Sequence, residues 1–170
     1  VTGTNGKTSV SVFVRQIWEE MGFRAASLGT IGIVGPDGVI PLNHTTPDPG
    51  VLHQALAALA ETGVEHLAVE ASSHVLTQNR LDGLNISAGA FTNLTRDHLD
   101  YHKTVEDYFD AKMELFERLL PRGALAVINA DMAEASEIKR RCEVVGLVPF
   151  MVGEQGNDIR ILSRRETEND

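Results

Sequence analysis

Apolar residues recur at helical spacing in four parts of the chain. Over residues 7–21, Val10, Val14 and Ile17 follow the three-to-four-residue repeat of an amphipathic helix. Gly22 comes directly afterwards and is a typical C-terminal stop. Three further segments show similar spacing and are predicted as helices, namely residues 51–62, 104–120 and 133–141.

Shorter apolar segments between these helices have the character of strands. Residues 25–34 are predicted as one strand, followed by a turn at 35–38 and a short return strand at 39–40. Continuous apolar runs are typical of parallel strands that helices cover on both faces. We therefore predict an α/β fold, a three-layer P-loop-type sandwich with a mostly parallel sheet. The runs that support it are residues 66–70, 88–93, 124–129, 148–152 and 158–162.

Composition narrows the class of protein. A chain of 170 residues with 42% hydrophobic and 23% charged content is long enough for one domain with a core. The net charge of −9, without a lysine or arginine run, argues against nucleic acid and favours a small-molecule partner. The single Cys142 excludes an internal disulfide framework and fits a reducing cytosol. No signal peptide or membrane-length apolar run is present, so we expect a cytoplasmic protein without membrane contact.

The first nine residues turn a loop directly into a helix and are typical of a nucleotide-phosphate site. Gly3 and Gly6 lack a Cβ, so backbone N–H groups can approach an anion closely. The positive end of the following helix and the Lys7 ammonium add to this field, and the Thr8 hydroxyl can ligate Mg²⁺. The alternative is an ordinary glycine-rich turn capped by a lysine. The predicted nucleotide-binding residues here are Gly3, Thr4, Asn5, Gly6, Lys7, Thr8 and Ser9.

A buried strand normally precedes such a loop, so we expect a domain fragment whose first strand is missing. The carboxyl ends of parallel strands meet at one edge of a sheet, where ligands gather. Glu70 ends one apolar run, and a buried strand tolerates an acid there mainly as a metal-directed carboxylate. Asn93 and Asn129 end two other runs and should share this edge with Thr92. The polar loop at 72–80 follows Glu70 and can reach a substrate, although ordinary loop polarity would look the same.

Residues 92–102 contain two histidines and two aspartates between a strand and a helix. His98 is the better metal-ligand candidate because it lies nearer the strand end. Four of the other five histidines are interpreted as structural hydrogen-bonding residues, namely His44, His53, His66 and His102.

Lys112 falls within the apolar face of the helix predicted over residues 104–120. Its aliphatic stem could extend along the core and carry the ammonium to solvent. The alternative is chemical: burial lowers the pKa of a lysine, and the neutral amine can react with CO₂ to form a carbamate. A carbamate is an anion that can bind a metal.

These motifs resemble the Mur ligases, ATP-dependent amide-forming enzymes of peptidoglycan synthesis. The resemblance covers most of the chain and is closest to the members that add the third amino acid of the peptide. The motifs that carry it are Thr2-Gly3-Thr4-Asn5-Gly6-Lys7-Thr8, His44-Thr45-Thr46-Pro47, Glu70-Ala71-Ser72-Ser73-His74, Phe91-Thr92-Asn93-Leu94-Thr95-Arg96-Asp97-His98-Leu99-Asp100-Tyr101-His102, Ala111-Lys112 and Ile128-Asn129-Ala130-Asp131.

The resemblance implies roles for residues at matching positions. Lys7 and Thr8 would hold the ATP phosphates and Mg²⁺, with Lys7, Lys112 and Glu70 as the catalytic group. The implied metal ligands are Thr8, Glu70, His98 and Lys112 as its carbamate. Asn93, Asn129 and Asp131 would complete the nucleotide site, the last two near adenosine. The implied contacts to the muramoyl-dipeptide are Thr45, Thr46, Ser72, Gln78 and Arg80.

The family further implies a three-domain, monomeric enzyme. Residues 1–170 would form part of its central ATP-binding domain, without the N-terminal UDP-binding and C-terminal domains, and would be inactive alone. The implied reaction adds meso-diaminopimelate or L-lysine to UDP-N-acetylmuramoyl-L-alanyl-D-glutamate through an acyl phosphate. Two alternatives stay open, a folylpolyglutamate-synthase-like ligase and a non-catalytic nucleotide-binding module.

Overall fold

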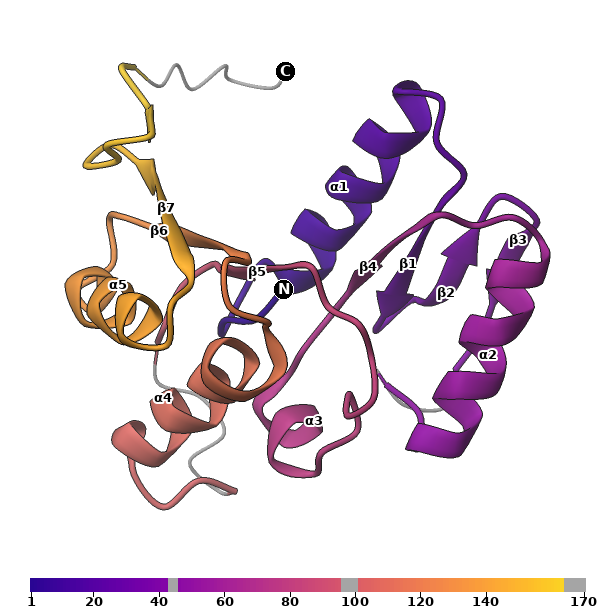
Figure 1. Cartoon of the computed structure of the whole chain (residues 1–170), viewed down its shortest axis with the longest axis horizontal. Coiled ribbons are helices and arrows are strands. Elements are labelled where there is room, and N and C mark those ends of the chain that lie inside the picture. The colour runs from indigo at the N-terminus through magenta and orange to yellow at the C-terminus, as the bar shows by residue number, and fades with distance from the viewer. Residues whose placement is uncertain (43–45, 96–100, 164–170) are drawn as a thin grey trace, which may run out of the picture.

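The computed structural model describes residues 1–42, 46–95 and 101–163 of the chain. Helices and strands alternate along most of it (Figure 1). In order, the elements are α1 (Lys7–Glu20), β1 (Ala25–Gly29), β2 (Gly32–Gly35), β3 (Gly38–Ile40), α2 (Pro49–Glu61), β4 (His66–Val69), α3 (Ser73–Thr77), β5 (Ala88–Phe91), α4 (Val105–Glu114), the π-helix η1 (Leu115–Leu119), β6 (Leu125–Asn129), α5 (Ala135–Val144), β7 (Val148–Gly153) and β8 (Ile159–Arg160).

The strands form two four-stranded sheets, in the orders β3-β2-β1-β4 and β5-β6-β7-β8. All pairs in the second sheet are parallel, as is β1 with β4. Among the strands in the described residues, only the β1-β2 and β2-β3 pairs are antiparallel. The prediction of an α/β fold with a mostly parallel sheet is therefore confirmed.

Val1 and Thr2 join the two sheets. The Val1 amine donates to Val69 O (2.7 Å), and the N–H of Ala71 donates to Val1 O (2.8 Å), on the β4 side. On the β5 side, Thr2 N donates to Ala90 O (2.8 Å), and Thr2 O accepts from Thr92 N (3.0 Å). Both ladders are parallel in sense, so these two residues occupy the place of a central strand. We call the junction formed by Val1 and Thr2 the seam between the two sheets. The phosphate loop predicted from the sequence begins directly after it.

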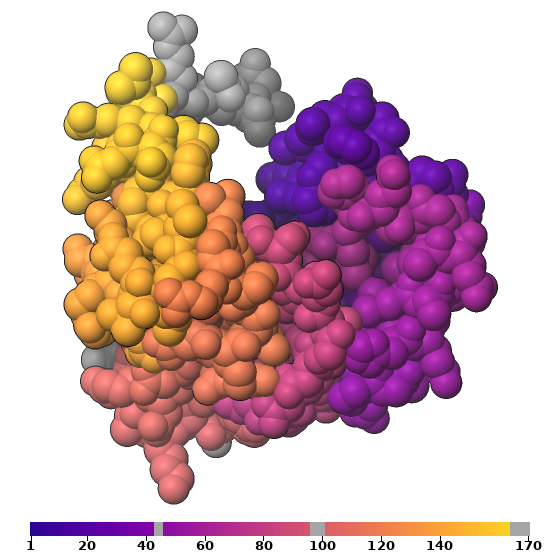
Figure 2. Space-filling model, in the orientation of Figure 1, coloured from indigo at the N-terminus to yellow at the C-terminus, as the bar shows by residue number. Residues whose placement is uncertain are grey.

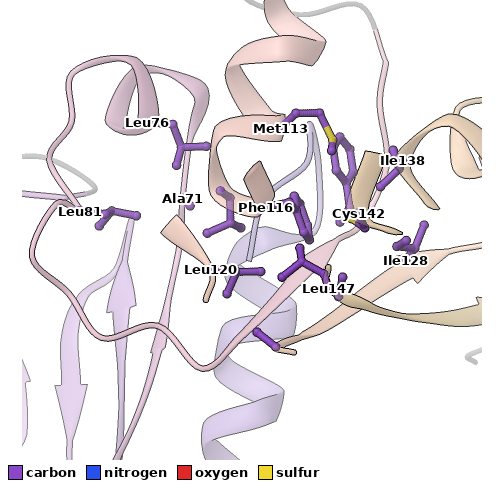
Figure 3. Close-up of a cluster of buried hydrophobic side chains, with 14 of the residues drawn as sticks. Ala71, Leu76, Leu81, Met113, Phe116, Leu120, Ile128, Ile138, Cys142 and Leu147 are labelled. Carbon is purple, nitrogen blue, oxygen red and sulfur yellow. The ribbon is translucent and has the colours of Figure 1, made fainter. Parts of the chain in front are cut away.

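Helices lie on both sides of the strands, with α1 on one side and α3, α4 and α5 on the other (Figure 1). A large part of the core lies where α4, η1 and α5 meet the second sheet. Phe116, Ile138 and Cys142 are completely buried there (Figure 3). Burial raises the pKa of the Cys142 thiol to about 11, so it behaves as an apolar group at neutral pH.

Helix α1 has less cover than its sequence pattern predicts. Val10 and Val14 are half-buried, whereas Ile17 is 58% and Met21 64% exposed. On this helix, Ser11 is the buried residue. At one end of the molecule the surface is notched between α1 in indigo and the C-terminal strands in yellow (Figure 2). Part of the apolar face of α1 is therefore exposed at the surface, where the sequence pattern predicts packing against other apolar residues.

The largest correction concerns residues 25–34, which do not form one strand. They form β1 and β2, an antiparallel pair that closes at Gly29 opposite Gly32. Two glycines inside one apolar run allow the chain to reverse at Thr30 and Ile31. The hairpin predicted for residues 35–40 is confirmed as β2-β3.

Two further predictions also need correction, one of a helix and one of a loop. The helix predicted over residues 104–120 is α4 followed by the π-helix η1, which has the wider i→i+5 turn. Thr104 is the N-cap of α4, because its Oγ1 accepts from the Asp107 N–H at 3.0 Å. The polar loop at residues 72–80 contains the short helix α3. In the described parts of the chain, no helix has the length and hydropathy of a membrane span.

Candidate functional site

The glycine-rich loop leads into α1 as the sequence predicts. Gly6 is the N-cap and has a φ of 81°, in the left-handed region that glycine adopts without strain. Gly3 has a φ of 137°, and a Cβ there would overlap the Thr92 hydroxyl. The first N–H groups of a helix have no partner within the helix. The loop therefore presents the first turn of α1, with its partial positive charge, to the carboxyl edge of the sheet.

Asn93 fastens this loop to the end of β5. Its Oδ1 accepts from the Asn5 N–H (2.8 Å), and its Nδ2 donates to Asn5 O (3.0 Å). The Thr92 hydroxyl also donates to Asn5 O, at 2.7 Å. The backbone of Asn93 adds a further bond, accepting from Thr4 N at 2.9 Å. Asn93 lies at the predicted edge and, in this structure, its amide holds the loop in shape.

Lys7 lies back over the loop that precedes it. Its Nζ donates to Gly3 O at 2.9 Å and to Thr4 O at 2.7 Å. These carbonyls keep the ammonium beside the first turn of α1. Lys7 would have to leave them to reach an anion beyond the loop.

Thr8 and Glu70 form the central polar pair of the site. The Thr8 hydroxyl donates to Glu70 Oε2 at 2.9 Å, although 62 residues separate them in sequence. Glu70 is 2% exposed, which agrees with the prediction of a buried acid at the end of its strand. Its other oxygen, Oε1, accepts from the N–H of Thr30 at 2.9 Å. The sequence alone does not indicate Thr30, because its contact depends on the reversal of the chain after β1.

Lys112 is buried at 1% exposure, and the core-facing position predicted for it is correct. Its Nζ donates to Gly3 O at 2.9 Å and lies 4.1 Å from the centre of the Tyr108 ring. Tyr108 is itself buried, and its hydroxyl donates to Thr4 Oγ1 at 3.3 Å. Both α4 side chains therefore contact the phosphate loop, and the stem of Lys112 does not carry its ammonium to solvent.

An aromatic cluster that the sequence did not indicate surrounds these contacts. The His102 ring lies 5.2 Å from that of Tyr108, and His74 packs 3.9 Å from Tyr101, between ring centres. The pKa of Tyr101 is lowered, first by its hydrogen bond with Thr77. The cluster connects α3 with α4. Aromatic pairs of this kind are hard to detect in sequence, because their partners lie on different elements.

Two of the residues expected to contact substrate lie close to Glu70. Thr46 is 1% exposed, and its hydroxyl donates to Glu70 O at 3.4 Å. Arg80 donates from Nη1 to Thr46 O at 2.8 Å. By contrast, the Ser72 hydroxyl caps α3 by accepting from the Val75 N–H at 3.3 Å.

Gln78 is exposed at the end of α3. The predicted Thr45 and His98, together with His44, lie outside the described residues. Within the described ranges, no group of three or more histidine, cysteine or acidic side chains is arranged for a metal ion.

Asn129 and Asp131 connect the ends of neighbouring strands. Asn129 Nδ2 donates to Thr92 O at 2.8 Å, and its Oδ1 accepts from Asp131 N at 3.0 Å. The carboxylate of Asp131 accepts from the N–H groups of Glu154 and Gln155, both at 2.9 Å. Asn129 thus reaches the predicted edge, and Asp131 holds the turn after β7. A contact of either residue with adenosine stays a prediction.

A glycine loop that opens a helix, beside a threonine–carboxylate pair at the ends of parallel strands, defines a P-loop-type nucleotide-binding domain. A family model described as the Mur ligase middle domain matches residues 1–169. The chain therefore belongs to the Mur ligase family, as the resemblance of its motifs predicted.

Similar proteins carry a consistent name. The chain is 53% identical over 168 residues to the UDP-N-acetylmuramoyl-L-alanyl-D-glutamate--2,6-diaminopimelate ligase of Mesorhizobium japonicum, covering 99% of this chain and 34% of that protein. It is 52% identical over 157 residues to the ligase of the same name from Bradyrhizobium diazoefficiens, covering 92% of this chain and 32% of that protein. The chain thus spans about a third of the length of these relatives.

A solved structure of a ligase with this name has a similar fold. Its TM-score is 0.81 at 36% sequence identity, covering 92% of this chain and 32% of that one. The similarity therefore includes nearly the whole chain.

Proposed function

We propose that the protein to which this chain belongs is an ATP-dependent ligase that joins 2,6-diaminopimelate to UDP-N-acetylmuramoyl-L-alanyl-D-glutamate in peptidoglycan synthesis. The relatives that carry this name, at 53% and 52% identity, support the assignment. The structural observation that carries it is the 2.9 Å hydrogen bond from Thr8 to Glu70, which places a carboxylate beside the phosphate loop.

Residues 1–170 would form part of the central, ATP-binding domain of this ligase. The chain spans about a third of its relatives, and the remaining length would supply the N-terminal UDP-binding and C-terminal domains. The isolated segment would then be inactive. The complete enzyme would act as a cytoplasmic monomer on small-molecule substrates.

The phosphates of ATP would bind at the first turn of α1. The N–H groups of this turn and the helix dipole favour an anion there. Asn93 and Thr92 stabilise the loop before the nucleotide arrives, so little ordering accompanies binding. Lys7 would exchange the carbonyls of Gly3 and Thr4 for phosphate oxygens. Asn129 and Asp131 would lie near the adenosine.

The donors present fit Mg²⁺, which prefers carboxylate, hydroxyl and phosphate oxygens. A hydroxyl that donates its proton to Glu70 keeps its oxygen lone pairs, so the Thr8 oxygen can still accept a cation. Glu70, Thr8 and His98 would hold the metal, and Lys112 would contribute as a carbamate. Bound Mg²⁺ would neutralise negative charge on the transferring phosphate.

The reaction brings two anions together. The terminal carboxylate of the dipeptide would attack the γ-phosphorus of ATP, giving an acyl phosphate and ADP. The amine of the incoming amino acid would then displace phosphate and form the amide. The cationic groups Lys7 and Arg80 would reduce the repulsion in the first step. Thr45, Thr46, Ser72, Gln78 and Arg80 would position the dipeptide.

An assay of the full-length parent protein tests this assignment. ADP release and product mass are measured with ATP, Mg²⁺, the UDP-linked dipeptide and diaminopimelate. We expect an amide product that requires all four components and is lost in Glu70→Ala but retained in Glu61→Ala, a change of an exposed acid on α2. Use of L-lysine instead would revise the amino acid. Glutamylation of a pterin would identify the rival ligase, and nucleotide binding without an amide product would indicate a non-catalytic module.

A further inference from the structure

The turn that follows β1 contacts the carboxylate of Glu70, which Thr8 of the phosphate loop also contacts. The N–H of Thr30 donates to Glu70 Oε1 at 2.9 Å. The other oxygen, Oε2, accepts from the Thr8 hydroxyl, also at 2.9 Å. The Thr30 hydroxyl adds a longer bond to Oε2 at 3.5 Å. The turn therefore holds the carboxylate mainly through a backbone N–H on Oε1, while the phosphate loop holds Oε2.

Gly29 makes this contact possible. A Cβ at this position would overlap the carboxylate of Glu70, so a larger residue would displace it. The requirement for glycine is one of space, because Gly29 does not have a positive φ. The close approach of backbone and carboxylate thus depends on a residue without a side chain.

Strand pairing brings the two segments together. Strands β1 and β4 are parallel with Leu28 opposite Val69, and the Glu70 N–H continues the ladder to Leu28 O at 2.8 Å. Strand β1 ends at Gly29 and the chain reverses at Thr30, while β4 ends at Val69 and is followed by Glu70. Glu70 therefore lies beside the start of the turn. The first N–H of the turn points back toward the acid that has just left the neighbouring strand.

We propose that the Gly29–Thr30 turn is a positioning element for the divalent-cation site, acting through Glu70. It fixes Oε1 with a rigid backbone donor, so that Oε2 stays next to Thr8 and the phosphate loop. This inference rests on the proposed function, because it concerns the cation that accompanies ATP. Residues that orient a ligand carboxylate commonly affect metal affinity about 10- to 100-fold.

A backbone donor suits this role for two reasons. Its bond to a carboxylate is charge-assisted and therefore stronger than one between neutral groups. The backbone of a hairpin also has little conformational freedom to lose when a cation binds. Without the Thr30 contact, the carboxylate could rotate about its side-chain bonds and separate Oε2 from Thr8.

Gly29→Ala in the full-length parent protein tests the proposal. Binding of a fluorescent ATP analogue is titrated with Mg²⁺, which measures cation affinity without turnover. We expect the Mg²⁺ concentration at half-saturation to rise about 10- to 100-fold, with nucleotide binding at saturating Mg²⁺ retained. Gly50→Ala is the matched control, since Gly50 lies in open space in the first turn of α2. An unchanged Mg²⁺ midpoint in Gly29→Ala would overturn the proposal.

A double-mutant cycle with Glu70→Ala separates positioning from a general loss of structure. Alanine removes the three atoms nearest to a Cβ at position 29, which are Oε1, Cδ and Cγ of Glu70, so Gly29→Ala should add almost nothing to the Mg²⁺ midpoint in that background. An equal Mg²⁺ shift in both backgrounds would show that the effect does not pass through Glu70.

Hydrogen exchange gives a readout that does not depend on Gly29→Ala folding. The Thr30 amide should exchange slowly in the unaltered protein and at least about tenfold faster in Glu70→Ala, because a single hydrogen bond of about 1.4 kcal/mol corresponds to that factor. Equal exchange rates would contradict the contact. If the unaltered protein bound no Mg²⁺·ATP, the proposed function itself would fail, which is a different outcome from a failure of these comparisons.

Discussion

Lys7 and Lys112 donate to the same oxygen, the carbonyl of Gly3, each at 2.9 Å. Lys7 belongs to the phosphate loop and Lys112 to α4, so one carbonyl joins two cations from distant parts of the sequence. Like charges at short range repel each other unless an anion lies nearby. The arrangement favours either an anionic ligand at this position or the conversion of one lysine to an anion.

Lys112→Ala tests which form of this lysine matters. In the full-length parent protein we expect kcat/KM to fall at least about 100-fold, the usual effect of removing a preorganised electrostatic group. If the carbamate is the active form, a short-chain carboxylic acid should restore part of the activity and ethylamine should not. Lys139→Ala, on the exposed side of α5, is the control. Full activity of Lys112→Ala without any additive would exclude a role for the carbamate.

Asn93→Ala should loosen the phosphate loop. The change removes two hydrogen bonds to Asn5, which together correspond to about 2 kcal/mol and a fall in Tm of about 4–8 °C. We also expect a higher KM for ATP, because the loop must then be ordered at the cost of binding energy. Thermal unfolding and steady-state kinetics measure the two effects, with the exposed Gln16→Ala on α1 as control. A raised KM with an unchanged Tm would instead indicate direct contact with the nucleotide.

Asp131→Ala should release the turn that follows β7. Its carboxylate accepts from two backbone N–H groups, and their loss should destabilise the domain by about 1–3 kcal/mol. Hydrogen exchange should become faster at Glu154 and Gln155. If exchange there were unchanged and only the KM for ATP rose, the main role of Asp131 would be at the adenosine.

The α-amino group of Val1 should make stability depend on pH in a polypeptide that begins at this residue. Burial lowers the pKa of this group from 8.0 to about 5. Between these values the unfolded chain binds the proton and the folded chain does not, so stability rises from pH 5 to pH 8. The contribution is complete above pH 8 and is lost as the pH falls toward 5. Urea unfolding across this range should show the slope, and acetylation of Val1 should remove it.

An extended apolar segment attached in front of Val1 should stabilise the domain. A cavity of about 470 Å³ lies beside Val1, lined by Val14, Trp18, Val69 and Ala90 among others. A further strand there would pair with β4 and β5 and cover α1. We expect a sharper melt and a Tm several degrees higher than with a glycine-serine extension of equal length. Without such a segment, we expect poor solubility, because strand edges and apolar surface stay exposed.

Features encoded locally could be predicted from the sequence. Helical spacing and Gly22 locate α1 almost to the residue, and an acid after an apolar run identifies Glu70 as buried. The position of Lys112 within an apolar face likewise predicts its burial. These signals depend on neighbours within one element, which a single sequence contains.

Features that depend on distant contacts could not be predicted in the same way. Asn93 and Asn5 lie 88 residues apart, and only the parallel seam brings them together. The reversal at Thr30 is hidden because two short strands with glycines between them look like one longer apolar strand. The contact between Tyr108 and Lys112 follows from helical spacing, but their shared contact with the loop depends on how α4 packs.

The seam formed by Val1 and Thr2 gives the phosphate loop a mechanical role. The two sheets meet through the same two residues from which the loop starts, so a displacement of one sheet against the other would also move Gly3 and the residues after it. A ligand that fixes the loop would therefore resist the parting of the sheets. Binding at the nucleotide site should therefore raise the free energy of unfolding of the whole domain, because the same loop binds the ligand and joins the sheets.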